Sequence, residues 1–126
     1  MLSIAAVAAG GAIGSVARYL AGLLATQLFG SSFPWGTLVI NVTGSFLMGV
    51  LVALLAKRWN SPDFVEVFLT VGVCGGYTTF STFSLDAYDL IEKSAGLEAL
   101  AYVVASAILS IGALAAAMLL LRSLPG

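Results

Sequence analysis

The chain has 126 residues, 60% of them hydrophobic and 9% charged, with a mean hydropathy of +1.08, whereas a water-soluble domain typically carries about a quarter of charged residues. Five Lys and Arg against six Asp and Glu leave no basic surface for nucleic acid, and the absence of histidine removes the commonest metal ligand and proton shuttle. This composition excludes a soluble globule and a nucleic-acid-binding protein, argues against an enzyme, and indicates a protein that lies in a lipid bilayer.

Four apolar segments are long enough to cross a membrane, because a helix needs about 20 apolar residues to span the roughly 30 Å hydrocarbon core. We expect these spans at about residues 2–28, 36–56, 63–84 and 97–121. The connections between them are short, so neighbouring helices must run antiparallel. We therefore predict an all-α membrane protein whose residues 1–126 form one four-helix transmembrane domain.

The first predicted span contains Arg18, the only full charge well inside a span. A guanidinium on a long apolar stem can reach the interface, so we expect Arg18 to extend towards the helix end and to gather anions at a pore mouth. The same span contains no acidic residue. A small multidrug exporter, the nearest alternative function, needs a carboxylate at that depth to exchange protons for a cationic drug.

Small residues recur four positions apart in every span, and such spacing lets helix backbones approach closely where no hydrophobic effect drives them together. The pairs are Gly10 and Gly14, Ser45 and Gly49, Gly72 and Gly76, and Ser106 and Ser110. Together they predict a compact bundle with little internal void.

The second span contains Asn41 at a deep position. A carboxamide in hydrocarbon needs a hydrogen-bonding partner or a ligand. Two roles are open for it: Asn41 either ties helices together or contacts a permeating ion.

The third span is the one that departs from a plain apolar helix. Its middle, residues 75–84, reads GGYTTFSTFS, and two successive glycines cost about 2 kcal/mol relative to alanines in a helix interior. Backbone freed by a break cannot face lipid, so it must face protein, an ion or a water-filled path. Freed carbonyl oxygens would suit a hard cation such as Na⁺, and amide ends would suit an anion. The alternative is an unbroken helix whose glycines merely pack closely.

Two phenylalanines lie on one face of this third span. Phe80 and Phe83 are three residues apart, and Ser81 and Thr82 lie between them in a stretch without aliphatic residues. A phenyl ring has a positive edge, so a ring turned edge-on can approach an anion while neighbouring hydroxyls donate hydrogen bonds. This setting favours a small-anion site, although a Phe-x-x-Phe pair by itself usually indicates core packing.

The fourth span carries a stripe of hydroxyls one helical turn apart, formed by Tyr102, Ser106 and Ser110. Such a stripe could relay a hydrogen-bonding ion along the helix. Serine hydroxyls in helices also commonly bond back to their own backbone carbonyls, which would leave nothing for an ion.

Charge on the connections gives only a mild orientation signal. The side that holds both termini carries Lys57, Arg58 and Arg122, and the opposite side carries Lys93, plus Arg18 if its head reaches that interface. The positive-inside rule then favours cytoplasmic termini, and so small a bias also permits insertion in both orientations.

Residues 36–41 (GTLVIN) and residues 75–84 resemble the Fluc (CrcB) fluoride channels, and the resemblance covers the whole chain. It implies an antiparallel homodimer of dual topology in the inner (plasma) membrane, with two fluoride pathways. By resemblance, the pathway residues are Asn41, Phe80, Ser81, Thr82, Phe83, Tyr102, Ser106 and Ser110. Arg18 matches the vestibule arginine, and the backbone carbonyls of Gly75 and Thr78 match those that hold a structural Na⁺ on the dimer axis.

The resulting hypothesis is a passive channel that exports fluoride from the cytoplasm and protects the cell against fluoride. A cell-negative potential supplies about 2.3 kcal/mol per charge per 100 mV, so no coupled energy source is needed. A structural subunit of a larger membrane complex is the other alternative, but it leaves the polar third span without a purpose.

Overall fold

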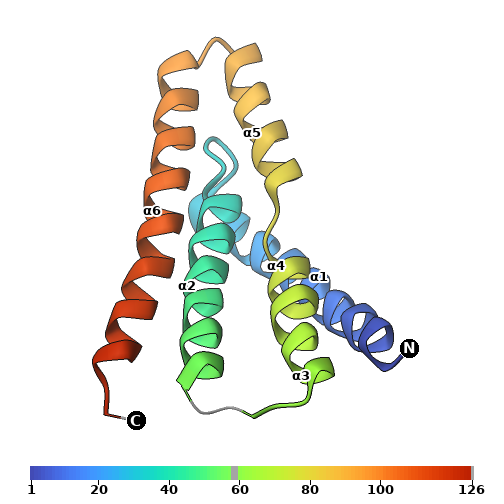
Figure 1. Cartoon of the computed structure of the whole chain (residues 1–126). Coiled ribbons are helices and arrows are strands. Elements are labelled where there is room, and N and C mark those ends of the chain that lie inside the picture. Colours follow the sequence, from blue (N-terminus) through green and yellow to red (C-terminus); the bar gives the residue numbers. More distant parts are fainter. Residues whose placement is uncertain (58–59, 126) are drawn as a thin grey trace.

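The computed structural model describes residues 1–57 and 60–125, and Arg58 of the charge comparison lies outside this part. The elements in chain order are α1 (Leu2–Phe29), α2 (Trp35–Lys57), α3 (Asp63–Val67), the π-helical segment η1 (Phe68–Cys74), α4 (Gly75–Tyr77), α5 (Phe80–Glu92) and α6 (Gly96–Ser123). Figure 1 shows α5 and α6 as a hairpin at the top, with α2 beside α6.

The prediction of four membrane spans is confirmed for the part of the chain that the structure describes. Four helices there are long and apolar enough to cross a bilayer: α1, α2, α6 and the composite third helix Asp63–Glu92. The third span continues past its predicted end at Ser84 because α5 is amphipathic. Its Leu90 is buried in a cluster with Ala99 and Tyr102 of α6, while Asp86 and Asp89 face a polar cavity.

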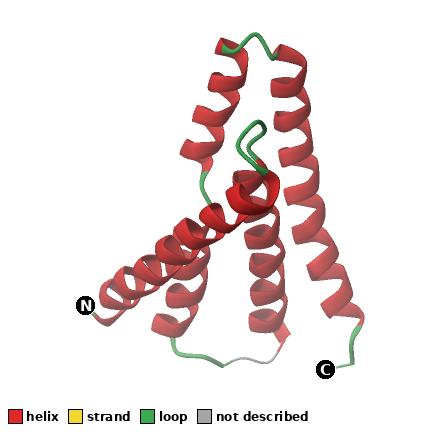
Figure 2. Cartoon of the chain, turned by 180° about the vertical axis from the view of Figure 1, so that it is seen from behind, coloured by secondary structure: helices red, strands yellow, loops and turns green. Residues whose placement is uncertain are grey.

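The first span packs obliquely across the third through its glycines. Figure 2 shows α1 crossing the other helices at a steep angle, and α1 contacts α3, η1 and α4. A Cβ atom added at Gly76 would lie 2.6 Å from the carbonyl oxygen of Gly11, and Gly10 and Gly72 meet backbone to backbone in the same way. The predicted close packing of these glycine pairs is therefore confirmed.

The second and fourth spans form the other closely packed pair. A Cβ atom added at Gly49 would lie 2.5 Å from the carbonyl oxygen of Leu114 and 2.9 Å from the Cβ atom of Ala117. In contrast, Ser106 and Ser110 of α6 border a cavity. The small residues Ser106 and Ser110 therefore leave space for a cavity and do not bring two helices into close contact.

The predicted break in the third span is present, but it lies after the two glycines. Gly75 and Gly76 are helical in α4, whereas Thr78 (φ −80°, ψ 158°) and Thr79 (φ −152°, ψ 118°) are extended. Gly76 lies directly against Gly11 of α1, so its lack of a side chain serves packing. Two β-branched threonines, which favour extended backbone, form the interruption.

Candidate ion pathway

The side chain of Asn41 on α2 holds the break in place. Its Nδ2 atom donates to the Thr79 carbonyl at 3.1 Å, and its Oδ1 atom accepts from the Thr79 N–H at 2.9 Å. One carboxamide thus satisfies both the N–H and the carbonyl of Thr79, two of the backbone groups that the interrupted helix leaves without helical partners. Asn41 therefore ties two helices together, and the second hydrogen on Nδ2 remains for a ligand.

The first span contributes a charge to the same break. Nη1 of Arg18 donates to the Thr78 carbonyl at 3.3 Å, and the Thr78 hydroxyl donates to the Cys74 carbonyl at 2.9 Å. Arg18 was expected to extend towards the end of its helix. The structure places its guanidinium beside the broken segment instead, because the Thr78 carbonyl offers an acceptor there.

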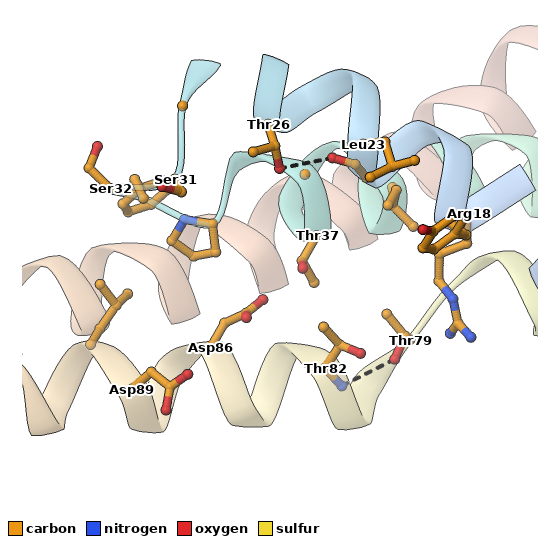
Figure 3. Close-up of a pocket in the computed structure, with 18 of the residues that line it drawn as sticks. Arg18, Leu23, Thr26, Ser31, Ser32, Thr37, Thr79, Thr82, Asp86 and Asp89 are labelled. Carbon is orange, nitrogen blue, oxygen red and sulfur yellow. Dashed lines mark hydrogen bonds between the residues drawn. The ribbon is translucent and has the colours of Figure 1, made fainter. Parts of the chain in front are cut away.

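A polar cavity of about 490 Å³ lies on one side of the break, between α1, α2 and α5. Figure 3 shows Thr37, Thr79, Thr82 and Asp86 pointing into it, with Arg18 at one end and Ser31 and Ser32 at the other. Asp89 and Lys93 also line it. The cavity therefore offers a wet approach to the break, with charges of both signs around its wall.

A second cavity of about 520 Å³, here called the phenylalanine cavity, lies between α2, α5 and α6. It brings together five of the residues predicted from the sequence: Asn41, Phe80, Phe83, Ser106 and Ser110. Ser45, Thr78, Thr79, Val103, Ala107 and Ile111 complete its described lining. These residues bear no full charge, so an ion in this cavity would be held by hydrogen bonds and ring edges.

Two hydroxyls of the phenylalanine cavity lack a hydrogen-bonding partner. The Oγ atoms of Ser106 and Ser110 are buried and unpaired within the described part of the chain, and Ser106 is only 6% exposed. A buried hydroxyl without a partner costs about 1–3 kcal/mol. A ligand in the cavity could accept the hydrogens of both hydroxyls. The sequence left open whether these serines bond back to their own helix, and the structure shows that their hydroxyls are free of such bonds.

The two predicted phenylalanines are adjacent, with ring centroids 5.4 Å apart and ring planes tilted by 45°. Phe83 is half-buried and its ring lies 5.3 Å from that of Tyr102, whereas Phe80 is 79% exposed. An aromatic ring this exposed at the middle of a span faces either lipid or another protein chain. A single chain therefore leaves the phenylalanine cavity open beside Phe80.

Comparison with known proteins agrees with this geometry. The family described as CrcB-like protein, Camphor Resistance (CrcB), matches residues 5–118, a range that contains every residue lining the phenylalanine cavity. The chain belongs to the CrcB family. A relative from Nitrobacter hamburgensis, named "Fluoride-specific ion channel FluC 1", is 58% identical over 121 residues, which are 96% of each chain.

Further relatives named "Fluoride-specific ion channel FluC" cover almost the whole CrcB-family chain. The protein of Agrobacterium fabrum is 54% identical over 98% of this chain and 99% of its own. The protein of Rhodospirillum centenum is 51% identical over 98% of each. The similarity thus includes all four spans, the break and both cavities.

In this CrcB-family chain, Tyr102 is set apart from the serines with which it shares a stripe. It is fully buried, its hydroxyl donates to Oδ2 of Asp86 at 3.1 Å, and its ring meets that of Phe33 edge-on. Its one hydroxyl hydrogen is therefore already used. Among the described residues, Tyr102 supports Phe83 from behind and does not line either cavity.

Ser81 and Thr82 also take different positions from those the sequence suggested. Thr82 lines the polar cavity, and its N–H donates to the Thr79 hydroxyl at 3.1 Å, which caps the start of α5. The exposed Ser81 hydroxyl pairs with the same Thr79 oxygen at 3.3 Å. Neither residue borders the phenylalanine cavity.

The polar residues of the two cavities that sequence reasoning missed include Thr37, Ser45, Thr79 and Asp86. Thr79 lines both cavities and is 8% exposed, so it forms the boundary between them. Thr37 and Ser45 lie one helical turn to either side of Asn41 on α2. That four-residue spacing was visible in the sequence and would have identified both.

Proposed function

We propose that the chain is a passive, fluoride-selective ion channel of the cell membrane, through which fluoride leaves the cytoplasm down its electrochemical gradient. Its CrcB membership and the printed names of relatives more than 50% identical to it support this function. The observation that carries the proposal is the phenylalanine cavity, where unpaired serine hydroxyls, a carboxamide and two phenyl rings meet without a full charge.

Fluoride fits these donors for chemical reasons. It is the smallest halide and a strong hydrogen-bond acceptor, so hydroxyl and amide hydrogens can replace its water shell. The free hydrogen of Asn41 and the hydroxyls of Ser106 and Ser110 supply such donors, and bonds to an ion are stronger than neutral ones. Chloride is larger and a weaker acceptor, so the same donors would compensate its dehydration less well.

The charges are arranged for an anion to enter and leave. The wall of the polar cavity carries Arg18 and Lys93 against Asp86 and Asp89, and Arg18 is the charge bonded to the break itself. At that point its guanidinium would attract an anion. The phenylalanine cavity beyond it holds no fixed positive charge that would trap the ion. Edge-on approach to Phe80 and Phe83 would provide weak stabilisation between the hydroxyl donors.

The functional unit of the proposal is an antiparallel homodimer of dual topology with two fluoride pathways. Phe80 is 79% exposed beside an open cavity, and a second copy of the chain would cover it. A two-fold dimer presents the same surface from both chains, so each pathway would be closed in the same way. Opposite insertion of the two copies agrees with the small charge bias between the two membrane sides.

A structural Na⁺ on the dimer axis belongs to the same proposal. The Gly75 and Thr78 carbonyls would hold it, and the Thr78 carbonyl would then serve both the cation and Nη1 of Arg18. The Thr79 N–H, which a continuous helix would donate to the Gly75 carbonyl, is donated to Asn41 instead. Freed carbonyl oxygens are suitable ligands for a hard cation, and no carboxylate cluster for a metal is found among the described residues. When bound, the cation would supply a fixed positive charge that attracts the carbonyls of both chains.

The test is anion efflux from liposomes that contain the purified protein, measured with fluoride- and chloride-selective electrodes. We expect rapid fluoride efflux once the membrane potential is short-circuited, with little chloride efflux. Equal fluxes of the two ions, or no flux of either, would reject the proposed function.

A further inference from the structure

Three polar residues form a stripe on α2, each one helical turn from the next. Thr37 lines the polar cavity, Asn41 holds the break between the cavities, and Ser45 lines the phenylalanine cavity. Positions four residues apart lie on the same face of a helix. Ser45 therefore faces the same interior as Asn41, one turn further from the polar cavity.

We propose that Ser45 is a further fluoride ligand, which donates its hydroxyl to the anion from the α2 wall while Ser106 and Ser110 donate from the α6 wall. This inference rests on the proposed channel function and deepens it. All three serines line one cavity, and α2 and α6 pack directly against each other. The anion would thus be held between two spans and not along one.

Several other hydroxyls of the spans differ from these three because they are bonded within their own helix. Bonds from a side-chain hydroxyl to a backbone carbonyl of the same helix are formed by Thr26, Thr43, Thr70, Thr78, Ser84 and Ser123. Within residues 1–57 and 60–125, Ser45, Ser106 and Ser110 form no such bond. Their hydrogens are available to a ligand, and Ser106 is more than nine-tenths buried.

Donors in the cavity are few, which makes Ser45 important for an anion that has lost its water. The Thr78 hydroxyl is bonded to Cys74, and the Thr79 hydroxyl oxygen is engaged by Thr82 and Ser81. The remaining donors are the second Nδ2 hydrogen of Asn41 and the hydroxyls of Ser45, Ser106 and Ser110, together with the Thr79 hydroxyl when Ser81 is the donor of their pair. Without Ser45, the α2 wall offers no donor beyond Asn41 in this part of the cavity.

The experiment compares fluoride efflux from liposomes for wild type, Ser45→Ala, Ser45→Thr and the control Ser84→Ala. Ser84 is an exposed hydroxyl that bonds back to the Phe80 carbonyl, so its removal leaves the cavity donors unchanged. We expect Ser45→Ala to conduct about tenfold more slowly, as for loss of one hydrogen bond to an ion. Ser45→Thr keeps the hydroxyl, and Ser84→Ala keeps the pathway, so both should stay within about threefold of wild type.

Size-exclusion elution of each variant separates loss of a ligand from loss of the folded protein. The inference stands if Ser45→Ala elutes as wild type does and conducts slowly. It is overturned if that variant conducts at the wild-type rate, or if Ser45→Thr is slowed equally, since shape alone would then matter. Absence of fluoride flux in wild type would overturn the channel function together with this inference. Equally fast flux in wild type and Ser45→Ala would overturn the inference alone.

A double variant tests whether the two walls hold the same ion. If Ser45 and Ser110 bind one anion, the loss in Ser45→Ala/Ser110→Ala should differ from the product of the single losses. Independent, multiplicative losses would contradict a shared ion.

Discussion

A single side chain can serve both the fold and the site, and Asn41 is the clearest case. Its carboxamide completes the two backbone hydrogen bonds that the extended Thr79 has lost, and it still has one free hydrogen facing the phenylalanine cavity. Tyr102, in contrast, serves the fold alone, because its hydroxyl is bonded to Asp86 and its ring packs against Phe83. The chemical type of a residue therefore did not decide its role; its hydrogen-bond partners did.

Asn41→Ala should destabilise the protein as well as slow its fluoride flux. Removing the carboxamide leaves the N–H and carbonyl of Thr79 without partners at membrane depth, which costs about 2 kcal/mol or more. Thermal unfolding of the detergent-solubilised protein would measure the loss. Val39→Ala, an exposed position on the same helix, is the control and should change the unfolding temperature little. A wild-type unfolding temperature for Asn41→Ala would contradict the bridging role.

Phe80→Ile should reduce fluoride flux without reducing stability. The ring is mostly exposed, so its loss removes little packing, whereas an aliphatic side chain offers the anion no positive ring edge. We expect flux to fall about tenfold, the size of one aromatic interaction. Phe46→Ile replaces another exposed phenylalanine, which lies on α2 outside the cavity, and should leave flux unchanged. Normal conduction through Phe80→Ile would rule out the ring-edge mechanism.

At the scale of helices, the third span is assembled from pieces with different tasks. The segment η1 and α4 press their glycines against α1, the extended pair Thr78 and Thr79 changes the direction of the chain, and α5 carries the two phenylalanines to the cavity. Two other spans hold the interruption, through Arg18 of α1 and Asn41 of α2. The break is thus a structural element whose Thr78 carbonyl and Thr79 backbone groups are satisfied by neighbouring helices.

Gly76→Ala should destabilise the bundle, although alanine is the better helix former. The added methyl group would lie 2.6 Å from the Gly11 carbonyl oxygen, and such overpacking costs about 1–3 kcal/mol. Gly112→Ala on α6 is the matched control, because a Cβ atom there meets nothing within 4 Å. Gly76→Ala should lower the unfolding temperature relative to wild type, whereas Gly112→Ala should not lower it. Equal unfolding temperatures for the two variants would show that α1 and α4 pack less closely than described.

At the scale of the whole molecule, one chain forms most of the proposed pathway and leaves one side of it open. Among the described residues, Thr79 alone lines both the polar cavity and the phenylalanine cavity, and the exposed Phe80 lies beside the second of them. The proposed partner is a second copy inserted the other way, which would close each cavity by symmetry.

Passive conduction predicts a reversal potential that follows the fluoride gradient alone. In planar bilayers, the potential of zero current should equal the fluoride Nernst potential and should not change when a Na⁺ or proton gradient is imposed. The physical reason is that a structural cation stays bound and the phenylalanine cavity contains no titratable side chain among its described lining. A shift of the reversal potential with the Na⁺ gradient would instead indicate coupled transport.

Composition and local pattern were sufficient for the class of protein, the spans and the existence of an interruption in the third one. These features depend on the sum of side-chain transfer energies over about 20 residues and on poor helix propensity within a few. The same local pattern placed Phe80 with Phe83, and Ser106 with Ser110, on one face of their helices, because residues three and four apart share a helix face. That the two pairs line one cavity did not follow from local pattern.

Tertiary structure alone decided where the break falls and which polar groups are free. The chain is extended at Thr79 because Asn41, 38 positions away, replaces the helical partners of its N–H and carbonyl. Gly76, at the expected break point, is needed for contact with α1. Whether a hydroxyl is available likewise depends on distant partners, as with Tyr102 and Asp86. Hydrogen bonds between spans are set by three-dimensional proximity, which no local pattern of residues contains.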